Sequence, residues 1–271
     1  MPFLDINQAK IHYQEAGQGP ETIVFSHGLL MNCTMYRAQV EVLSKRYRCI
    51  SYDHRGQGRS EVTKGGYDMD SLADDAAALI RALDCGACHF VGLSMGGFVG
   101  MRLAIHRPEL LKSLTLMDTS AGPEPEHKKG SYRRMAFVGR WLGFRLVVKP
   151  VMKLLFGQTF LNDPDRESLR EEWKQRLISL DRIGATRAAR GVIERKGVEE
   201  NLSGITTPTL IIVGEEDAAT PVPMSRSIHE AISESKLAII PRAGHTSNIE
   251  EPDAVNRALE PFLASVKWVS V

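Results

Sequence analysis

Residues 90–97, Phe-Val-Gly-Leu-Ser-Met-Gly-Gly, decide how this chain folds. The apolar residues that open this stretch predict a buried strand, and the residues after Ser94 predict a helix. A serine between a strand and a helix sits on a sharp, strained turn, where side chains two positions before and after it would clash. Gly92 and Gly96 remove those side chains. The sequence therefore predicts a Gly-x-Ser-x-Gly turn that presents the hydroxyl of Ser94 at the end of a strand.

Short apolar runs recur on both sides of this turn, bounded by Gly, Asp or Pro. The runs are continuous rather than alternating, which is typical of strands buried on both faces of a parallel sheet. Helical patterns lie between several of them, for example over residues 70–83. Together they predict an α/β protein with helices on both faces of its sheet and an antiparallel edge hairpin up to about Tyr13. The predicted strands span residues 22–25, 49–52, 89–91, 114–117, 210–213 and 237–240.

One long stretch, residues 122–202, contains no strand pattern and only helical patterns rich in Arg and Lys. A helical insertion of this size between two strands predicts a separate cap over the sheet. We therefore expect a core domain of residues 1–121 and 203–271 and a helical cap of residues 122–202, called the cap segment below. A chain of 271 residues favours one core with an insertion over two equal domains.

The composition, with 43% hydrophobic and 25% charged residues, is typical of a soluble globular protein. A net charge of +1 gives no reason to expect nucleic acid as a partner. No apolar run is long enough for a membrane span, and the first ten residues lack the basic start and apolar stretch of a secretory signal. We expect a cytoplasmic protein without an integral membrane segment.

The four cysteines are Cys33, Cys49, Cys85 and Cys88. The last two have the spacing of a zinc or redox half-site, but no second pair accompanies them and their flanks indicate a helix-to-strand turn. Buried, reduced thiols are the better interpretation, and we expect no metal and no cofactor.

Four signatures in the chain resemble the α/β-hydrolase family, and the resemblance extends over essentially the whole chain. Residues 26–29 (Ser-His-Gly-Leu) stand where that family has its oxyanion loop, and residues 53–60 resemble its Asp-x-Arg-Gly-x-Gly-x-Ser turn. The serine turn at 92–96 follows, and residues 214–217 and 243–245 come after the last two strands. The order serine, acid, histidine is the one this fold uses. The resemblance implies an α/β-hydrolase fold, with a mostly parallel sheet, a helical cap and the activity of a serine hydrolase.

The resemblance also implies a catalytic triad of Ser94, His245 and Asp217. A serine hydroxyl is a poor nucleophile until a base takes its proton, and the imidazole of His245 can take that proton and return it to the leaving group. Asp217 would fix the tautomer of the imidazole and stabilise its cation. By the same resemblance, the backbone N–H groups of Leu29 and Met95 would donate to the oxyanion.

Two alternatives concern the acid and the branch of the family. Asp118 also ends a strand, where some relatives place their acid, so it stays open beside Asp217. Glu215 and Glu216 adjoin Asp217, but the family pattern Gly-x-x-Asp selects the aspartate. Haloalkane dehalogenases and epoxide hydrolases of this fold carry an aspartate at the turn, and Ser94 excludes that chemistry.

What remains is acyl transfer to water. We expect hydrolysis of a carboxylic ester of a small, largely apolar molecule through an acyl-enzyme. Hydrolysis of an enol-lactone or of a C–C bond in a diketone is the alternative. A receptor of this fold, which binds a small ligand and recruits partners through its cap, is the alternative outside enzymes.

The cap segment is expected to roof the substrate pocket. Residues 131–161 carry six basic side chains and no Asp or Glu, interleaved with bulky apolar residues. Either their apolar face covers the site while the bases are solvated, or the basic surface attaches weakly to anionic membranes or acidic substrates. Both interpretations predict an apolar roof. We expect Trp141, Phe144, Met31 and Val222 to contact the substrate.

The arginines of residues 182–195 have two interpretations as well. In the first, one of these arginines binds a carboxylate of the substrate. In the second, that arginine pairs with Glu194, Glu199 or Glu200. Both stay open at the level of the sequence.

Overall fold

A computed structural model describes residues 2–266 and contains an eight-stranded sheet in the order β1-β2-β4-β3-β5-β6-β7-β8. Strands β3 to β8 run parallel, whereas β1 and β2 form the predicted antiparallel edge hairpin. This arrangement confirms the predicted mostly parallel sheet. The strands are β1 (Phe3–Ile6), β2 (Ala9–Ala16), β3 (Thr22–Ser26), β4 (Arg48–Tyr52), β5 (Cys88–Leu93), β6 (Leu111–Met117), β7 (Thr209–Gly214) and β8 (Lys236–Ile240).

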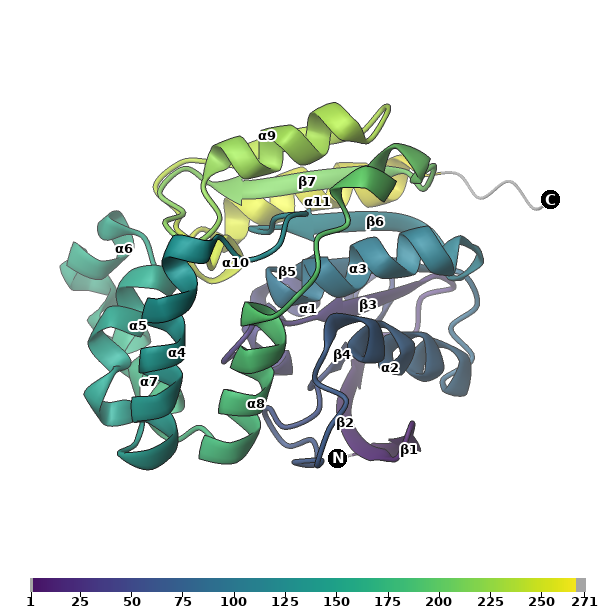
Figure 1. The fold of residues 1–271 in the computed structure, drawn as a ribbon. Helices are drawn as coiled ribbons and strands as arrows, with labels where there is room; N and C mark the ends of the chain where they lie inside the picture. The colour runs from purple at the N-terminus through teal and green to yellow at the C-terminus, as the bar shows by residue number, and fades with distance from the viewer. Residues whose placement is uncertain (1, 267–271) are drawn as a thin grey trace.

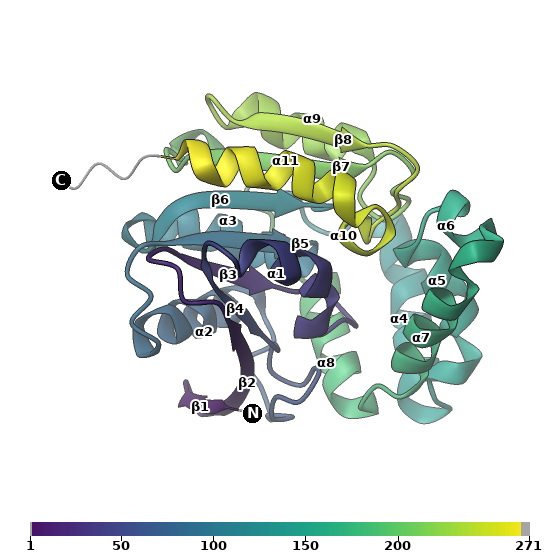
Figure 2. The ribbon, with the colours of Figure 1, turned by 180° about the vertical axis from the view of Figure 1, so that it is seen from behind.

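Helices cover both faces of the sheet, as expected. Figures 1 and 2 show α2 (Met69–Ala82), α3 (Met95–His106) and α9 (Val222–Ala231) on one face. The other face carries α1 (Arg37–Leu43) and α11 (Pro252–Ser265), which follows the short α10 directly. The remaining short elements outside residues 122–202 are η1 (Cys33–Tyr36), η2 (Pro108–Leu110) and α10 (Ser247–Glu250).

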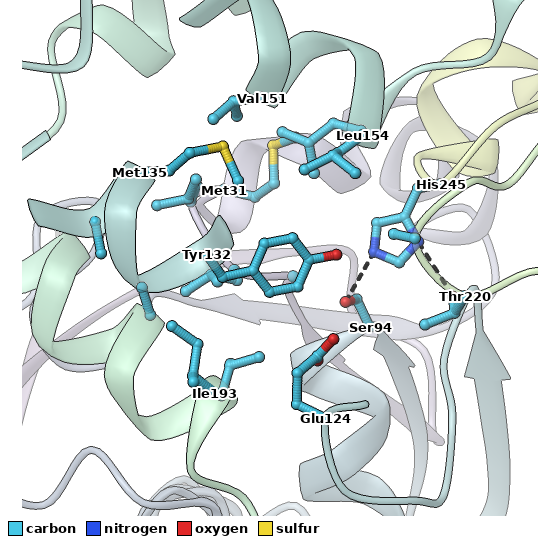
Figure 3. A pocket seen from close by; sticks show the side chains of 18 of the residues that line it. Met31, Ser94, Glu124, Tyr132, Met135, Val151, Leu154, Ile193, Thr220 and His245 are labelled. Carbon is cyan, nitrogen blue, oxygen red and sulfur yellow. Dashed lines mark hydrogen bonds between the residues drawn. The ribbon is translucent and has the colours of Figure 1, made fainter. Parts of the chain in front are cut away.

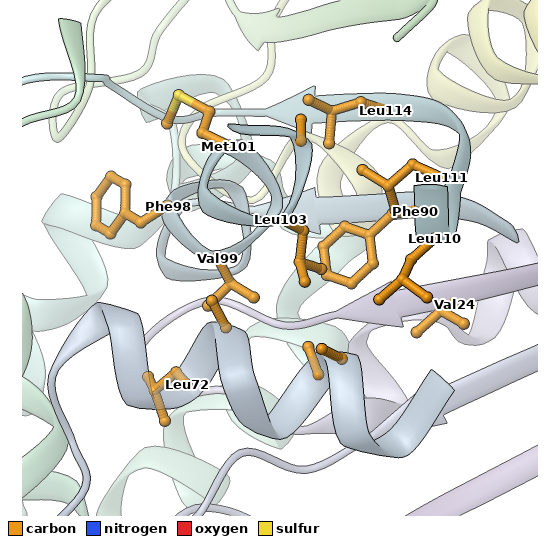
Figure 4. Close-up of a cluster of buried hydrophobic side chains, with 14 of the residues drawn as sticks. Val24, Leu72, Phe90, Phe98, Val99, Met101, Leu103, Leu110, Leu111 and Leu114 are labelled. Carbon is orange, nitrogen blue, oxygen red and sulfur yellow. The ribbon is translucent and has the colours of Figure 1, made fainter. Parts of the chain in front are cut away.

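The core between the sheet and α3 holds the serine turn in place. Phe90 of β5 and Leu114 of β6 are fully buried against Val99 and Leu103 of α3 (Figure 4). Burying one side chain of this size stabilises a fold by about 1.5–3 kcal/mol. The strand and the helix that flank Ser94 are therefore both fixed by packing.

The stretch between β6 and β7 is helical and stands beside the sheet (Figure 1). η5 crosses the expected boundary at residue 202, and the division into core and cap stays a prediction. The elements are α4 (Glu126–Trp141), η3 (Phe144–Leu146), α5 (Val148–Leu155), α6 (Gln158–Asn162), η4 (Pro164–Arg166), α7 (Glu167–Ile178), α8 (Arg182–Ile193) and η5 (Glu199–Gly204).

Strand β8 is not buried on both faces, because it is the edge strand of the sheet and Ile239 is 36% exposed. The four cysteines are free and buried.

Among residues 2–266, no helix has both the length and the apolar character needed to cross a bilayer.

Candidate active site

Ser94 lies on the turn between β5 and α3, with φ 52° and ψ −110°. Backbone angles of this kind are strained for any residue other than glycine. A Cβ at Gly92 would lie 2.2 Å from the carbonyl oxygen of Gly96, and one at Gly96 would lie 2.0 Å from that of Ser26. The predicted need for both glycines is confirmed.

The three predicted triad residues meet at the carboxyl end of the sheet. Ser94 Oγ lies 2.9 Å from His245 Nε2 (Figure 3). His245 Nδ1 lies 2.9 Å and 3.1 Å from the two carboxyl oxygens of Asp217. The loop after β7 supplies Asp217 and the loop after β8 supplies His245, so three distant parts of the chain build one hydrogen-bonded row.

The carboxylate of Asp217 is held by donors from its own loop. Its Oδ1 accepts the backbone N–H of Ala219 at 2.8 Å and that of Thr220 at 2.9 Å. The hydroxyl of Thr220 donates to Oδ2 at 2.8 Å. These bonds fix the orientation of the carboxylate towards the imidazole.

The rival acid, Asp118, is engaged elsewhere. Its carboxyl group accepts the backbone N–H of Gly214 at 2.7 Å and the hydroxyl of Ser247 at 2.5 Å. Burial, reinforced by the neighbouring charge of Asp217, raises the pKa of Asp118 well above its usual value. The carboxylate that contacts His245 is that of Asp217.

The environment of His245 sets its protonation. Complete burial lowers the pKa of its imidazole, but the charge and hydrogen bond of Asp217, together with the charges of Asp118 and Glu250, outweigh that effect. The pKa of His245 therefore lies above the usual 6.5. The neutral imidazole, which a general base requires, prevails only above that raised value.

Two buried or half-buried glutamates fasten the loops after β7 and β8 to the cap segment. Glu250 Oε2 accepts the backbone N–H groups of Gly157 at 2.8 Å and Gly244 at 2.9 Å. Glu216 accepts the backbone N–H of Thr159 at 2.8 Å and its hydroxyl at 2.5 Å. The start of α6 is thus joined to both loops that carry triad side chains.

The backbone N–H groups expected to stabilise the oxyanion are available. Leu29 lies in the loop after β3, and Met95 is the first residue of α3. Among residues 2–266, the hydrogen bonds found include none that either N–H donates. His27 shapes the loop, since its Nδ1 lies 2.7 Å from the carbonyl oxygen of Gly28 and its Nε2 accepts the backbone N–H of His54. The role of Leu29 and Met95 stays a prediction.

A mainly apolar cavity of about 140 Å³ opens beside Ser94 and His245 (Figure 3). The cap segment supplies a large part of its wall, through α4, α5 and α8. Met31 and Phe144 lie on this wall as expected. The other apolar side chains of the wall include Leu29, Leu30, Leu93, Phe98, Met135, Val147, Val151, Leu154, Leu155, Val192, Ile193 and Met224.

The expectation that Trp141 and Val222 line the pocket is wrong. Trp141 ends α4 and is 64% exposed, because the inner face of that helix is formed by residues such as Met135. Apolar residues occupy both faces of α4, so the pattern did not reveal which face turns inward. Val222 begins α9, and Met224 reaches the cavity in its place.

The sequence did not predict that three polar residues would meet on the cavity wall: Glu124, Tyr132 and Arg195. Arg195 Nη1 lies 2.6 Å from Glu124 Oε2, and both side chains are buried. This pairing differs from the expected partners Glu194, Glu199 and Glu200. The residues are 71 positions apart, and no local pattern joins them.

A second buried polar group, formed by His12, Cys33 and Asp53, brings three metal-binding types of atom within 4.8 Å. The two oxygens of Asp53 already accept the backbone N–H groups of Cys33 and Arg59, and one also bonds to His12 Nδ1. Burial raises the pKa of the Cys33 thiol, which disfavours the thiolate that metals bind. The group is explained as an internal anchor of the loop after β4, and we assign no metal to it.

A mostly parallel sheet with a Ser-His-Asp row at the carboxyl ends of its strands, reached through a strained Gly-x-Ser-x-Gly turn, defines the α/β hydrolases. The comparison with known families agrees. The chain belongs to the alpha/beta hydrolase fold family, whose model matches residues 21–252.

Individual relatives are similar over most of their length. A protein of Pseudomonas syringae provisionally named carbamate hydrolase RutD is 31% identical over 252 residues, covering 90% of this chain and 94% of its own. An esterase of Thermogutta terrifontis is 32% identical with a TM-score of 0.88, covering 95% and 94%. The enol-lactonase of Burkholderia xenovorans is 26% identical with a TM-score of 0.91, covering 97% and 100%. The protein is therefore a hydrolytic enzyme.

Proposed function

We propose that this enzyme cleaves a carboxylic ester of a small, largely apolar molecule, with Ser94 as nucleophile. The observation that carries the proposal is the 2.9 Å contact between Ser94 Oγ and His245 Nε2 at the wall of the cavity. An enol-lactone is the second candidate substrate, favoured by the similarity to the enol-lactonase over 97% of the chain. Its ring ester would be opened by the same chemistry.

The proposed reaction proceeds in two halves. His245 Nε2 takes the hydroxyl proton as Ser94 Oγ attacks the carbonyl carbon, and Asp217 stabilises the imidazolium. The backbone N–H groups of Leu29 and Met95 stabilise the developing oxyanion. His245 returns the proton to the leaving oxygen, and a water activated by the same imidazole then releases the acid.

The cavity limits the size and charge of the substrate that we propose. Its volume of about 140 Å³ is close to that of a cavity of about 150 Å³ that holds one benzene molecule. A short acyl chain or one aromatic ring therefore fits the enclosed part. The basic side chain on the wall, Arg195, is paired with Glu124 and offers no unpaired cation for a substrate carboxylate.

Repeated turnover tests the proposal. The wild-type enzyme should convert many molar equivalents of p-nitrophenyl butyrate, because water regenerates the hydroxyl of Ser94 after each acylation. Release of p-nitrophenol measured at a hundredfold excess of ester, with a lactone and a carbamate in parallel, gives the number of turnovers. A reaction that stops near one equivalent for every substrate would instead support the ligand-receptor alternative.

The pH profile follows from the raised pKa of His245. The base acts in its neutral form, so kcat/KM should fall as the pH drops through that pKa and reach half its plateau above pH 6.5. Measuring kcat/KM for p-nitrophenyl butyrate between pH 5 and 9 checks this. A profile that stays flat from about pH 5 to pH 8, with chemistry rate-limiting, would contradict the assigned base.

We also propose weak attachment of the cap segment to anionic lipid surfaces. Phe137, Trp141, Leu142 and Leu146 are 62–64% exposed, and six basic residues accompany them between positions 131 and 161. Exposed apolar side chains among bases fit the interface of an anionic bilayer. A symmetric contact with a second copy would instead bring the two sets of basic side chains together, and they would repel each other.

The cytoplasmic location stays a prediction. Four buried, free thiols are consistent with it.

Replacing Trp141 by alanine should weaken this attachment without changing acyl-chain preference. The loss of one interfacial aromatic side chain should lower partitioning into phosphatidylserine-containing vesicles by about 10-fold. Vesicle sedimentation gives the partitioning, and Ile239→Ala, an exposed apolar residue on β8, is the control. Equal partitioning of all three proteins would rule out this surface.

A further inference from the structure

The polar cluster of Glu124, Tyr132 and Arg195 lies on the cavity wall that the triad shares. Glu124 precedes α4, Tyr132 belongs to α4, and Arg195 follows α8. In Figure 3 the carboxyl group of Glu124 and the hydroxyl of Tyr132 both point towards Ser94. Two polar groups in a mainly apolar cavity are therefore aimed at the place where the acyl bond would lie.

This cluster has hydrogen-bonding capacity that the protein leaves unused. Glu124 Oε2 is bound by Arg195, whereas no hydrogen bond among residues 2–266 involves Glu124 Oε1 or the hydroxyl of Tyr132. Glu124 is only 8% exposed. Neither oxygen is among the fully buried atoms without a partner, so both are reached from the cavity, and a ligand with a matching polar group gains a hydrogen bond there.

The charges of the cluster restrict what that ligand is. Arg195 is held by Glu124, by the hydroxyl of Ser120 at 3.2 Å and by the carbonyl oxygen of Gly122 at 3.1 Å. Its guanidinium also lies 4.2 Å from the ring centre of Phe98. The group facing the cavity is thus the carboxylate oxygen, which attracts donors and repels another carboxylate. Burial and the charge of Glu124 raise the pKa of Tyr132 to about 12, so its hydroxyl keeps its proton.

We propose that Glu124 and Tyr132 form a subsite for a neutral hydrogen-bond donor of the substrate, a hydroxyl or an amide N–H, carried close to the scissile acyl bond. Glu124 Oε1 accepts from this donor, and the hydroxyl of Tyr132 bonds to the same hydroxyl or amide group. The subsite disfavours substrates with a carboxylate at that position. This inference rests on the proposed ester hydrolysis, and it adds a substrate class to it.

The test compares matched p-nitrophenyl esters: butyrate, 3-hydroxybutyrate, N-acetylglycinate and monosuccinate. The wild type should prefer a donor-bearing ester, hydroxy or acetamido, to butyrate in kcat/KM. Tyr132→Phe should reduce that preference by about 3- to 10-fold, the range of one hydrogen bond. Tyr13→Phe, in β2 and outside the cavity wall, should keep it. An unchanged preference in Tyr132→Phe would overturn the subsite.

A second variant tests the charge. Glu124→Gln keeps the shape of the side chain and leaves the guanidinium of Arg195 without its counter-charge, so the succinate-to-butyrate ratio of kcat/KM should rise by about 10-fold or more. General damage to the site would lower both rates together and leave the ratio unchanged, which counts against the proposal. Glu126→Gln, an exposed position of α4, is the control. If Glu124→Gln does not fold, the Tyr132→Phe result decides.

The two levels of proposal fail in different ways. Turnover of all four esters without any preference for a donor would overturn the subsite and leave ester hydrolysis standing. Absence of turnover for every ester, together with no labelling of Ser94 by an organophosphate, would overturn the proposed function and the subsite with it.

Discussion

Replacing Ser94 by alanine is expected to lower kcat for p-nitrophenyl butyrate by about a millionfold, the loss seen when a triad nucleophile is removed. The proposed acyl-enzyme forms on this hydroxyl, whose contact is with His245 at 2.9 Å. A small organophosphate should add one adduct to the wild type and none to Ser94→Ala. Stopped assays and intact-mass analysis measure the two effects.

The fold should survive this change. The side chain of Ser94 packs no core, and the strained turn is kept by Gly92 and Gly96. Ser225→Ala is a matched control, because Ser225 is buried in α9 and its hydroxyl has no hydrogen-bond partner within residues 2–266. An adduct on another residue, or a Ser94→Ala variant that keeps a tenth of the activity, would disprove the assigned nucleophile.

The second large effect is a difference in kcat between two aspartate variants. Asp217→Asn should lower kcat by about 10⁴-fold, because an amide beside His245 Nδ1 no longer holds the tautomer with a lone pair at Nε2. Asp118→Asn should cost less than about 10-fold. The carboxyl group of Asp118 bonds to Gly214 and Ser247 rather than to His245, and an amide of the same shape keeps an oxygen that accepts the backbone N–H of Gly214.

The two variants control for each other. Both side chains are buried and differ from asparagine by one atom group, so a general loss of packing would affect them alike. Steady-state kinetics at the pH plateau of each variant gives the comparison. Greater damage from Asp118→Asn would move the acid to the end of β6.

The serine turn was predictable because its requirements are local. The close approach of Gly92 to Gly96 and of Gly96 to Ser26 leaves room for glycine alone, so the sequence itself records the geometry. The strands followed from continuous apolar runs, except that an edge position leaves Ile239 partly exposed in a run that looks buried.

The pocket was predictable only in part, because its wall depends on which side of each cap helix faces inward. Helix α4 carries apolar residues on both sides, so the same pattern allowed Trp141 inside although Met135 lies there. The ion pair of Glu124 with Arg195 joins residues far apart in the chain. Such an ion pair arises from tertiary packing, and the spacing of residues in the sequence does not predict it.

The attachment of α6 to the loops after β7 and β8 has a consequence for protein engineering. Glu250 binds Gly157 and Gly244 through one oxygen, and Glu216 binds Thr159. A chimaera that imports the cap of a relative would replace the donors Gly157 and Thr159. Glu216 would then lose the donors of Thr159, whereas Glu250 would keep those of Gly244 and Thr246. Grafts that exchange residues 155–159 together with 214–217 and 243–250 keep the carboxylates and their donors from one parent. In recombination experiments, these three segments should therefore be taken from the same parent.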